Sequence, residues 1–203
     1  SGSAGEHRAP DPAEARISRD QAVAKLRQLF PELSKAEVQN VELGINNVYP
    51  PDNQMVWTIQ WNYAIGNSSY GFSSRVDAIT GELIDTSIYW PDAQENKIYY
   101  PPKLSREEAL KLAKAFIAKA APSVAVDELK ETTVTYPLDR PLFGPVMYDF
   151  RFERLINGVP APGEEIYINM DGNGKVKSFH RSPDHADYPS GSPKVTADEA
   201  MAL

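Results

Sequence analysis

The same helix opening occurs three times in this chain, at nearly equal spacing. In each copy an apolar residue precedes a hydroxyl residue, and Gln or Glu follows the hydroxyl by three positions: ISRDQ from Ile17, LSREE from Leu104 and VTADE from Val195. This is the capping box, in which the hydroxyl accepts from a first-turn N–H and the longer side chain accepts from the N–H of the cap residue. The offsets are 104 − 17 = 87 and 195 − 104 = 91 residues. The sequence therefore predicts two similar units and the first turns of a third.

Apolar residues at helical spacing follow the first two openings. In the second copy they form one face, and the lysines lie off it; the face is Ala109, Leu112, Ala113, Phe116, Ile117 and Ala120. The first helix is predicted over residues 19–30, with Ala22, Val23, Leu26, Leu29 and Phe30 inward and Pro31 at its end. Both patterns are typical of helices that cover a core.

About four strands follow each helix. The alternating segments are residues 37–49, 54–65, 70–77 and 82–89 in the first unit, and 129–136, 146–155, 165–170 and 175–180 in the second. The predicted fold class is α+β, with two tandem units that each pack one helix on an antiparallel sheet of about four strands. Trp57 and Trp61 share the inward face of one strand, where they form either sheet core or, as the alternative, a carbohydrate-stacking platform.

Composition and the positions of turn-forming residues give the expected domain limits. We expect a disordered tail over residues 1–14, which begins with a cloning remnant at residues 1–3. A first repeat follows over residues 15–100, a second over 101–188, and a linker with a truncated third repeat over 189–203. These limits indicate a fragment of a longer exported protein whose signal peptide is missing.

Charge and residue usage exclude several function classes. The net charge of −7 disfavours nucleic acid as a partner, and no apolar run is long enough to span a membrane. The chain has no cysteine, which removes disulfides, thiolate catalysis and Cys-based metal sites, and which is common in exported bacterial proteins.

Two segments resemble metal sites. His180 and His185 lie near Asp184 and Asp187, but prolines break this loop and no helical spacing aligns the ligands, so a solvated linker is the competing interpretation. The segment DGNG at residues 171–174 begins like a calcium loop, yet Lys175 stands where an oxygen ligand belongs. A hairpin turn is the preferred interpretation there.

Other candidate groups also have structural explanations. Glu107 and Glu108 fall in a helix first turn, where the backbone dipole favours acids, and Glu164 and Glu165 are adjacent at a strand edge. The sequence has no GxSxG nucleophile elbow. It also has no phosphate-binding Gly loop ahead of a predicted helix. We therefore predict no catalytic, cofactor-binding or metal-binding residues, no cofactor, and no enzymatic activity.

The strand and turn sequences resemble a known family. A helix, an aromatic strand and then VDAITGELI at residues 76–84 resemble the PepSY-type domain, and YDFRFERLINGVPAPGEEIYINMDGNGKVKSF at residues 148–179 is similar to the YcdB/YcdC repeat family. The first unit departs from the pattern, since it has GNSS at residues 66–69 in place of the Asn-Gly-Val turn.

The resemblance implies an extracellular or cell-wall protein of Gram-positive bacteria, in chains that also carry S-layer homology domains. PepSY domains occur in propeptides of metallopeptidases. The function that follows is a non-catalytic module that binds a protein or peptide, such as a peptidase or envelope protein, and regulates or inhibits it. The alternative is a structural spacer of a wall-attached protein with no specific ligand. An exposed aromatic or apolar surface on the sheet face away from the helix would favour binding, and a polar face would favour the spacer.

Overall fold

The computed structural model describes residues 11–46, 54–88, 103–133 and 147–182. The chain divides into two compact units, residues 1–84 and residues 85–203. Each unit contains one α-helix and antiparallel strands, so the predicted α+β class is confirmed. Predictions that concern residues 1–10, 89–102 and 183–203, including the third helix opening, lie outside the described residues.

The first unit begins with a short 3-10 helix, η1 (Pro12–Glu14), where the sequence predicted disorder. Asp11 caps this turn by accepting from the N–H of Ala13 at 2.9 Å, and Pro12 occupies its first position. Then follow α1 (Arg19–Leu29), η2 (Pro31–Lys35), β1 (Glu37–Ile45), β2 (Met55–Ile65), β3 (Ser68–Asp77) and β4 (Leu83–Ser87), of which residues 85–87 already belong to the second unit. The strand bounds agree with the predictions to within a few residues.

The second unit contains α2 (Arg106–Ala120), η4 (Val126–Glu128), β5 (Leu129–Glu131), β6 (Met147–Ile156), β7 (Val159–Asp171) and β8 (Val176–Ser182). Its strands pair antiparallel in the order β5–β6–β7–β8, and residues 85–87 of β4 pair with residues 178–180 of β8.

The sequence predicted two sheets of about four strands each. The count per half is right, but the hydrogen-bonded order is one series of eight, β1-β2-β3-β4-β8-β7-β6-β5. The prediction of two separate sheets is therefore wrong, because alternation defines the two faces of a strand and not its neighbours.

Both helix starts carry the predicted capping boxes. Ser18 accepts from the N–H of Gln21 and Ser105 from that of Glu108, and in each case the longer side chain accepts from the N–H of the cap residue. Each box satisfies two of the backbone donors that a helix start leaves without partners.

The residue before each cap is held in the same way in the two units. Trp57 Nε1 donates to the carbonyl of Ile17 at 2.8 Å, and the Tyr148 hydroxyl donates to the carbonyl of Leu104 at 2.5 Å. An aromatic residue at the start of the central strand thus fixes where the helix begins. The two units therefore share this contact as well as the capping box.

Each helix covers one sheet face. In the first unit the core includes Phe30, Ile59 and Trp61, and Trp57 is only 6% exposed, so the sheet-core interpretation of the tryptophans is right and the carbohydrate platform is wrong. In the second unit Phe150, Phe152 and Phe179 are buried, and the ring of Phe116 from α2 lies 5.8 Å from that of Phe179.

The predicted helix faces need one correction. Ala109, Ala113, Ile117 and Ala120 are buried, whereas Leu112 is 43% exposed. Leu112 lies at the margin of the apolar stripe, and its methyl group covers the β7–β8 turn at Gly174 instead of entering the core. No helix among the described residues is long and apolar enough to span a bilayer.

Candidate functional site

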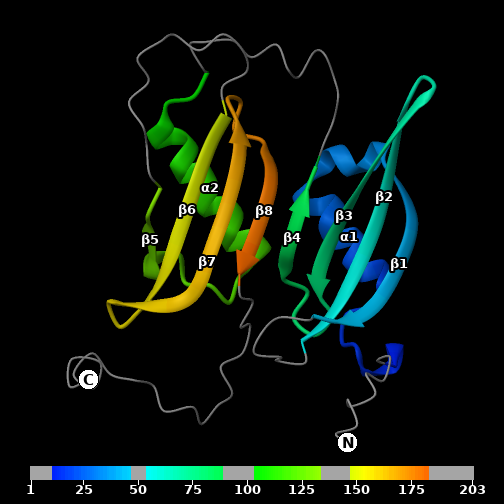
Figure 1. The fold of residues 1–203 in the computed structure, drawn as a ribbon, viewed down its shortest axis with the longest axis horizontal. Coiled ribbons are helices and arrows are strands. Elements are labelled where there is room, and N and C mark those ends of the chain that lie inside the picture. Colours follow the sequence, from blue (N-terminus) through cyan, green and yellow to red (C-terminus); the bar gives the residue numbers. More distant parts are fainter. Residues whose placement is uncertain (1–10, 47–53, 89–102, 134–146, 183–203) are drawn as a thin grey trace, which may run out of the picture. The chain divides into compact units, whose positions relative to one another are not determined.

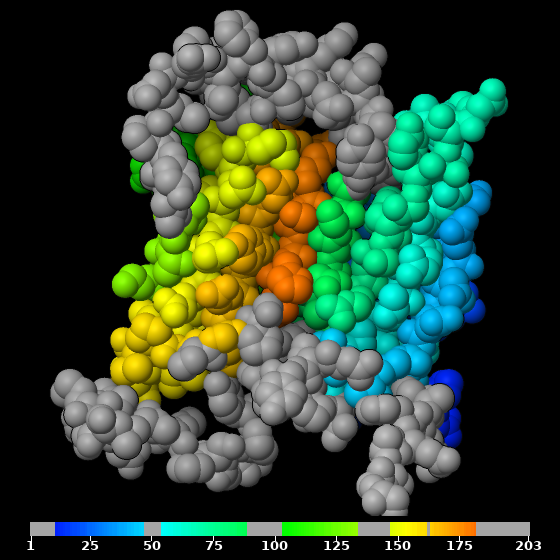
Figure 2. All heavy atoms as spheres, in the orientation of Figure 1, coloured from blue at the N-terminus to red at the C-terminus, as the bar shows by residue number. Residues whose placement is uncertain are grey.

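The sheet of the second unit has one face that packs on α2 and an opposite face that we call the open face. Alternation along β6 and β7 places Met147, Asp149, Arg151, Glu153, Glu165, Tyr167 and Asn169 on it. The strands β6 and β7 pass in front of α2 in Figure 1, so Figure 2 shows this open face in yellow and orange. It is the natural place to look for a site, because the other face is filled by the core.

An arginine and a tyrosine form the centre of the open face. Arg151 and Tyr167 are directly opposite each other on β6 and β7, and the guanidinium carbon lies 4.5 Å from the centroid of the tyrosine ring. Tyr167 remains 37% exposed. In the described part of the chain no carboxylate forms an ion pair with Arg151. The guanidinium therefore keeps N–H donors for a partner while it stacks on the ring.

One further contact and one exposed side chain shape the surface next to this pair. Asn169 donates its amide hydrogen to Asp149 across the strands at 2.6 Å, and Met147 at the start of β6 is 41% exposed. Tyrosine, arginine and methionine are the residue types that protein interfaces select over the rest of a surface.

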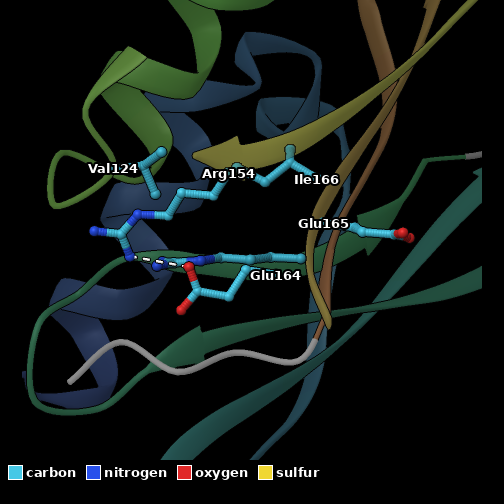
Figure 3. Close-up of a pocket in the computed structure, with 6 residues that line it drawn as sticks. Val124, Arg154, Glu164, Glu165 and Ile166 are labelled. Atoms are coloured by element: carbon cyan, nitrogen blue, oxygen red, sulfur yellow. Dashed lines mark hydrogen bonds and ion pairs between the residues drawn. The ribbon is translucent and has the colours of Figure 1, made fainter. Parts of the chain in front are cut away.

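A small pocket lies on the other side of the same strands. Its lining is Val124, Arg154, Glu164, Glu165, Ile166 and Arg181, and its volume of about 10 Å³ admits about one water molecule. Figure 3 shows the side chains of Arg154 and Glu164 pointing toward each other there, whereas the side chain of Glu165 points away from them, toward the open face. The pocket is too small for an organic ligand, so we assign it a structural role.

Arg154 ties three segments of the second unit together. Its Nη1 lies 3.1 Å from Glu164 of β7, and its Nε lies 3.3 Å from Glu128 of η4. Burial alone would lower the pKa of Arg154, but the charges of Glu164 and Glu128 outweigh it, so the pKa lies above its usual value. This cluster could not be recognised from the sequence, in which Glu164 and Glu165 are simply neighbours at one strand edge. Alternation sends them to opposite faces.

The groups weighed as metal ligands are only partly among the described residues. His180 is half exposed, and its Nδ1 lies 3.6 Å from the Asp85 carboxylate, while His185, Asp184 and Asp187 lie outside the described residues. Asp171 accepts from the N–H groups of Asn173 and Lys175 through one oxygen, as a hairpin turn requires. Over residues 11–46, 54–88, 103–133 and 147–182, no three His, Cys, Asp or Glu side chains could share a metal ion.

The glutamates in the first turn of α2 also have structural explanations. Glu108 completes the capping box of Ser105, and Glu107 is exposed at a helix N-terminus. That the chain has no catalytic, cofactor-binding or metal-binding residues stays a prediction.

Comparison with known proteins identifies the family. No curated protein matches the chain. The C-terminal domain of Bacillus megaterium YpeB has a similar fold: a TM-score of 0.53 and 14% sequence identity, over 92% of this chain and 74% of that one. The family model described as the YcdB, YcdC repeated domain matches residues 39–182. The family resemblance noted from the sequence is confirmed, and the chain belongs to the YcdB, YcdC repeated-domain family.

Proposed function

We propose that this chain is a non-catalytic, extracytoplasmic protein-binding module of tandem PepSY-like repeats. Its partner is a peptidase or another protein of the cell envelope, which the module regulates by holding it. The family assignment supports the PepSY-like repeat, and the absence of cysteine agrees with export. The proposed location is extracellular or at the cell wall.

One observation carries the binding function. Tyr167 is exposed beneath the guanidinium of Arg151 on the open face, which among the described residues is the side of β6 and β7 opposite to α2. A tyrosine that only served the sheet would gain more from burial, whereas an exposed Tyr–Arg pair offers a rigid aromatic surface and hydrogen-bond donors to a partner.

Three of the groups weighed for catalysis or metal binding take part in the fold, which supports a non-enzymatic function. Glu164 pairs with Arg154, Asp171 closes a turn, and Glu108 caps a helix.

The alternative is a structural spacer with no specific ligand. Asp149, Glu153, Glu165 and Asn169 are polar residues of the same open face and favour this alternative, because such a face is compatible with water.

Capture from a bacterial envelope and secreted fraction separates the two functions. The immobilised chain should retain a partner saturably and should reduce peptidase activity in the fraction as its concentration rises. Tyr167→Ala should lose both effects. Ile65→Ala, which removes an exposed apolar side chain from the first unit, should keep them. Failure of the chain to retain any protein, with peptidase activity unchanged, would establish the spacer.

A further inference from the structure

The charges of the open face indicate what kind of partner it fits. Asp149, Glu153 and Glu165 lie on this face with a single arginine, Arg151. On the β8 side His180 stands opposite Tyr167 and Asp85 opposite His180, so this neighbouring pair adds one carboxylate and one imidazole. Lys130 of β5 stands opposite Glu153, yet among the described residues neither Glu153 nor Glu165 forms an ion pair. Carboxylates therefore outnumber cations even when Lys130 is counted.

Two of these carboxylates are placed at a cost to the sheet. Glu153 and Glu165 are direct cross-strand partners, and like charges in that position repel each other. A sheet that served only as a spacer would gain stability from a neutral or basic residue at either position. A cation supplied by a partner would remove the repulsion.

The centre of the face completes the pattern. Arg151 is held over Tyr167, so its charge is localised at the middle, with the carboxylates at the periphery and the exposed side chain of Met147 at one end. A complementary segment has Lys or Arg toward the periphery and an aromatic or apolar side chain toward the centre.

We propose that the open face binds a cationic segment of a partner protein, in which Lys or Arg side chains pair with Glu153 and Glu165 while an apolar side chain packs on Tyr167 and Met147. The inference rests on the proposed binding function and specifies the chemistry of the partner. Ion pairs at an exposed surface are individually weak and screened by salt. Binding should therefore be fast and should weaken steeply as ionic strength rises.

Three short synthetic peptides test this directly: one alternates Lys with Leu and Tyr, and its analogues carry Gln or Glu at every Lys position. Titration of each into the isotopically labelled full chain, followed by amide chemical shifts, reports both affinity and place. The Lys peptide should shift the β6 and β7 amides around Arg151 and Tyr167. It should bind more tightly than the Gln peptide, and the Glu peptide should not bind.

Charge variants give the matched control. Glu153→Gln combined with Glu165→Gln should weaken the Lys peptide about two- to thirty-fold, as the loss of two exposed ion pairs implies. The same charge change made elsewhere, Glu107→Gln with Asp127→Asn, should leave the affinity unchanged. The Glu153/Glu165 variant should also unfold at a slightly higher temperature, because it removes the cross-strand repulsion.

The outcomes separate this inference from the function on which it rests. If the Gln peptide binds as tightly as the Lys peptide, and Tyr167→Ala abolishes both, the face binds proteins but does not select cations. Shifts confined to other elements, or no Lys-peptide binding at low salt, would overturn the cationic assignment. Capture from the envelope fraction would still decide the binding function.

Discussion

A methyl group at Gly174 should test how the β7–β8 turn docks on the start of α2. Gly174 has φ +87°, and a Cβ there would lie 2.7 Å from Cδ1 of Leu112 and 2.8 Å from Cδ1 of Leu104. Gly174→Ala therefore meets two penalties. The left-handed backbone costs an alanine about 1–2 kcal/mol, and overpacking costs about 1–3 kcal/mol.

The overpacking penalty should fall near the lower limit of its range. Both obstructing atoms are leucine methyls, and Leu112 is partly exposed and can rotate away. We expect Gly174→Ala to lower the free energy of unfolding by about 2–3 kcal/mol, of which about 1 kcal/mol reflects the contact with the helix start.

Gly158→Ala is the matched control in the same unit. Gly158 has φ +78° and nothing within 4 Å of its Cβ position, so only the backbone penalty applies. In urea unfolding followed by far-UV circular dichroism, the free energy of unfolding of Gly174→Ala should be about 1 kcal/mol lower than that of Gly158→Ala. In a Leu112→Ala background the difference should shrink, because one obstructing methyl is gone. Equal losses for Gly174→Ala and Gly158→Ala would refute the docking contact.

Three other substitutions test the contacts that shape the second unit. Tyr148→Phe should lower the free energy of unfolding by about 1 kcal/mol, because it removes the hydrogen bond to the carbonyl of Leu104. Burial first, and then the charge of Glu108, raises the pKa of Tyr148 in the folded state. Its contribution to stability is therefore complete below the unfolded-state pKa near 10 and is lost as pH rises through the folded-state pKa. The thermal unfolding temperature of the wild type should fall more steeply above about pH 10 than that of Tyr148→Phe. Parallel falls in the two unfolding temperatures would contradict this contribution of Tyr148. Glu164→Ala should cost about 1–3 kcal/mol by urea unfolding, because Arg154 loses a buried partner, and a neutral result would show the pair to be dispensable. Ser105→Ala should cost about 1 kcal/mol and increase amide hydrogen exchange in the first turn of α2, and unchanged exchange would contradict the capping box.

Local features of the fold could be predicted from the sequence because short-range chemistry determines them. The hydroxyl and the Gln or Glu of a capping box act on the same turn, so Ser18 and Ser105 marked the helix starts correctly. The alternation in β2 likewise predicted that Trp57 and Trp61 are core residues.

Features that depend on contacts between distant elements were not predictable in the same way. Nothing in residues 85–87 indicates that β8 is their neighbour, because alternation is satisfied by any partner strand. Arg154 occupies a core-facing position on β6, where an apolar residue is expected, and only Glu128 and Glu164 from elsewhere in the chain make it tolerable.

The candidate site was partly visible in the sequence. Alternation along residues 146–155 is enough to place Asp149, Arg151 and Glu153 on one face, opposite the aromatic residues, and so mostly polar a face favours a spacer. Tyr167 was not recognised as their neighbour, because its place opposite Arg151 depends on the register of β6 and β7. The register adds the exposed aromatic surface on which the binding function rests.

Site-specific photo-crosslinking tests the central claim most directly. A photoreactive phenylalanine analogue at position 167 places the crosslinker in the middle of the open face, and the same analogue at position 111 places it on the exposed side of α2. With an envelope and secreted fraction, position 167 should yield a discrete crosslinked protein that excess unlabelled chain competes away, and position 111 should not. Equal, non-competable labelling at both positions, or no product at position 167, would contradict a binding function for this face.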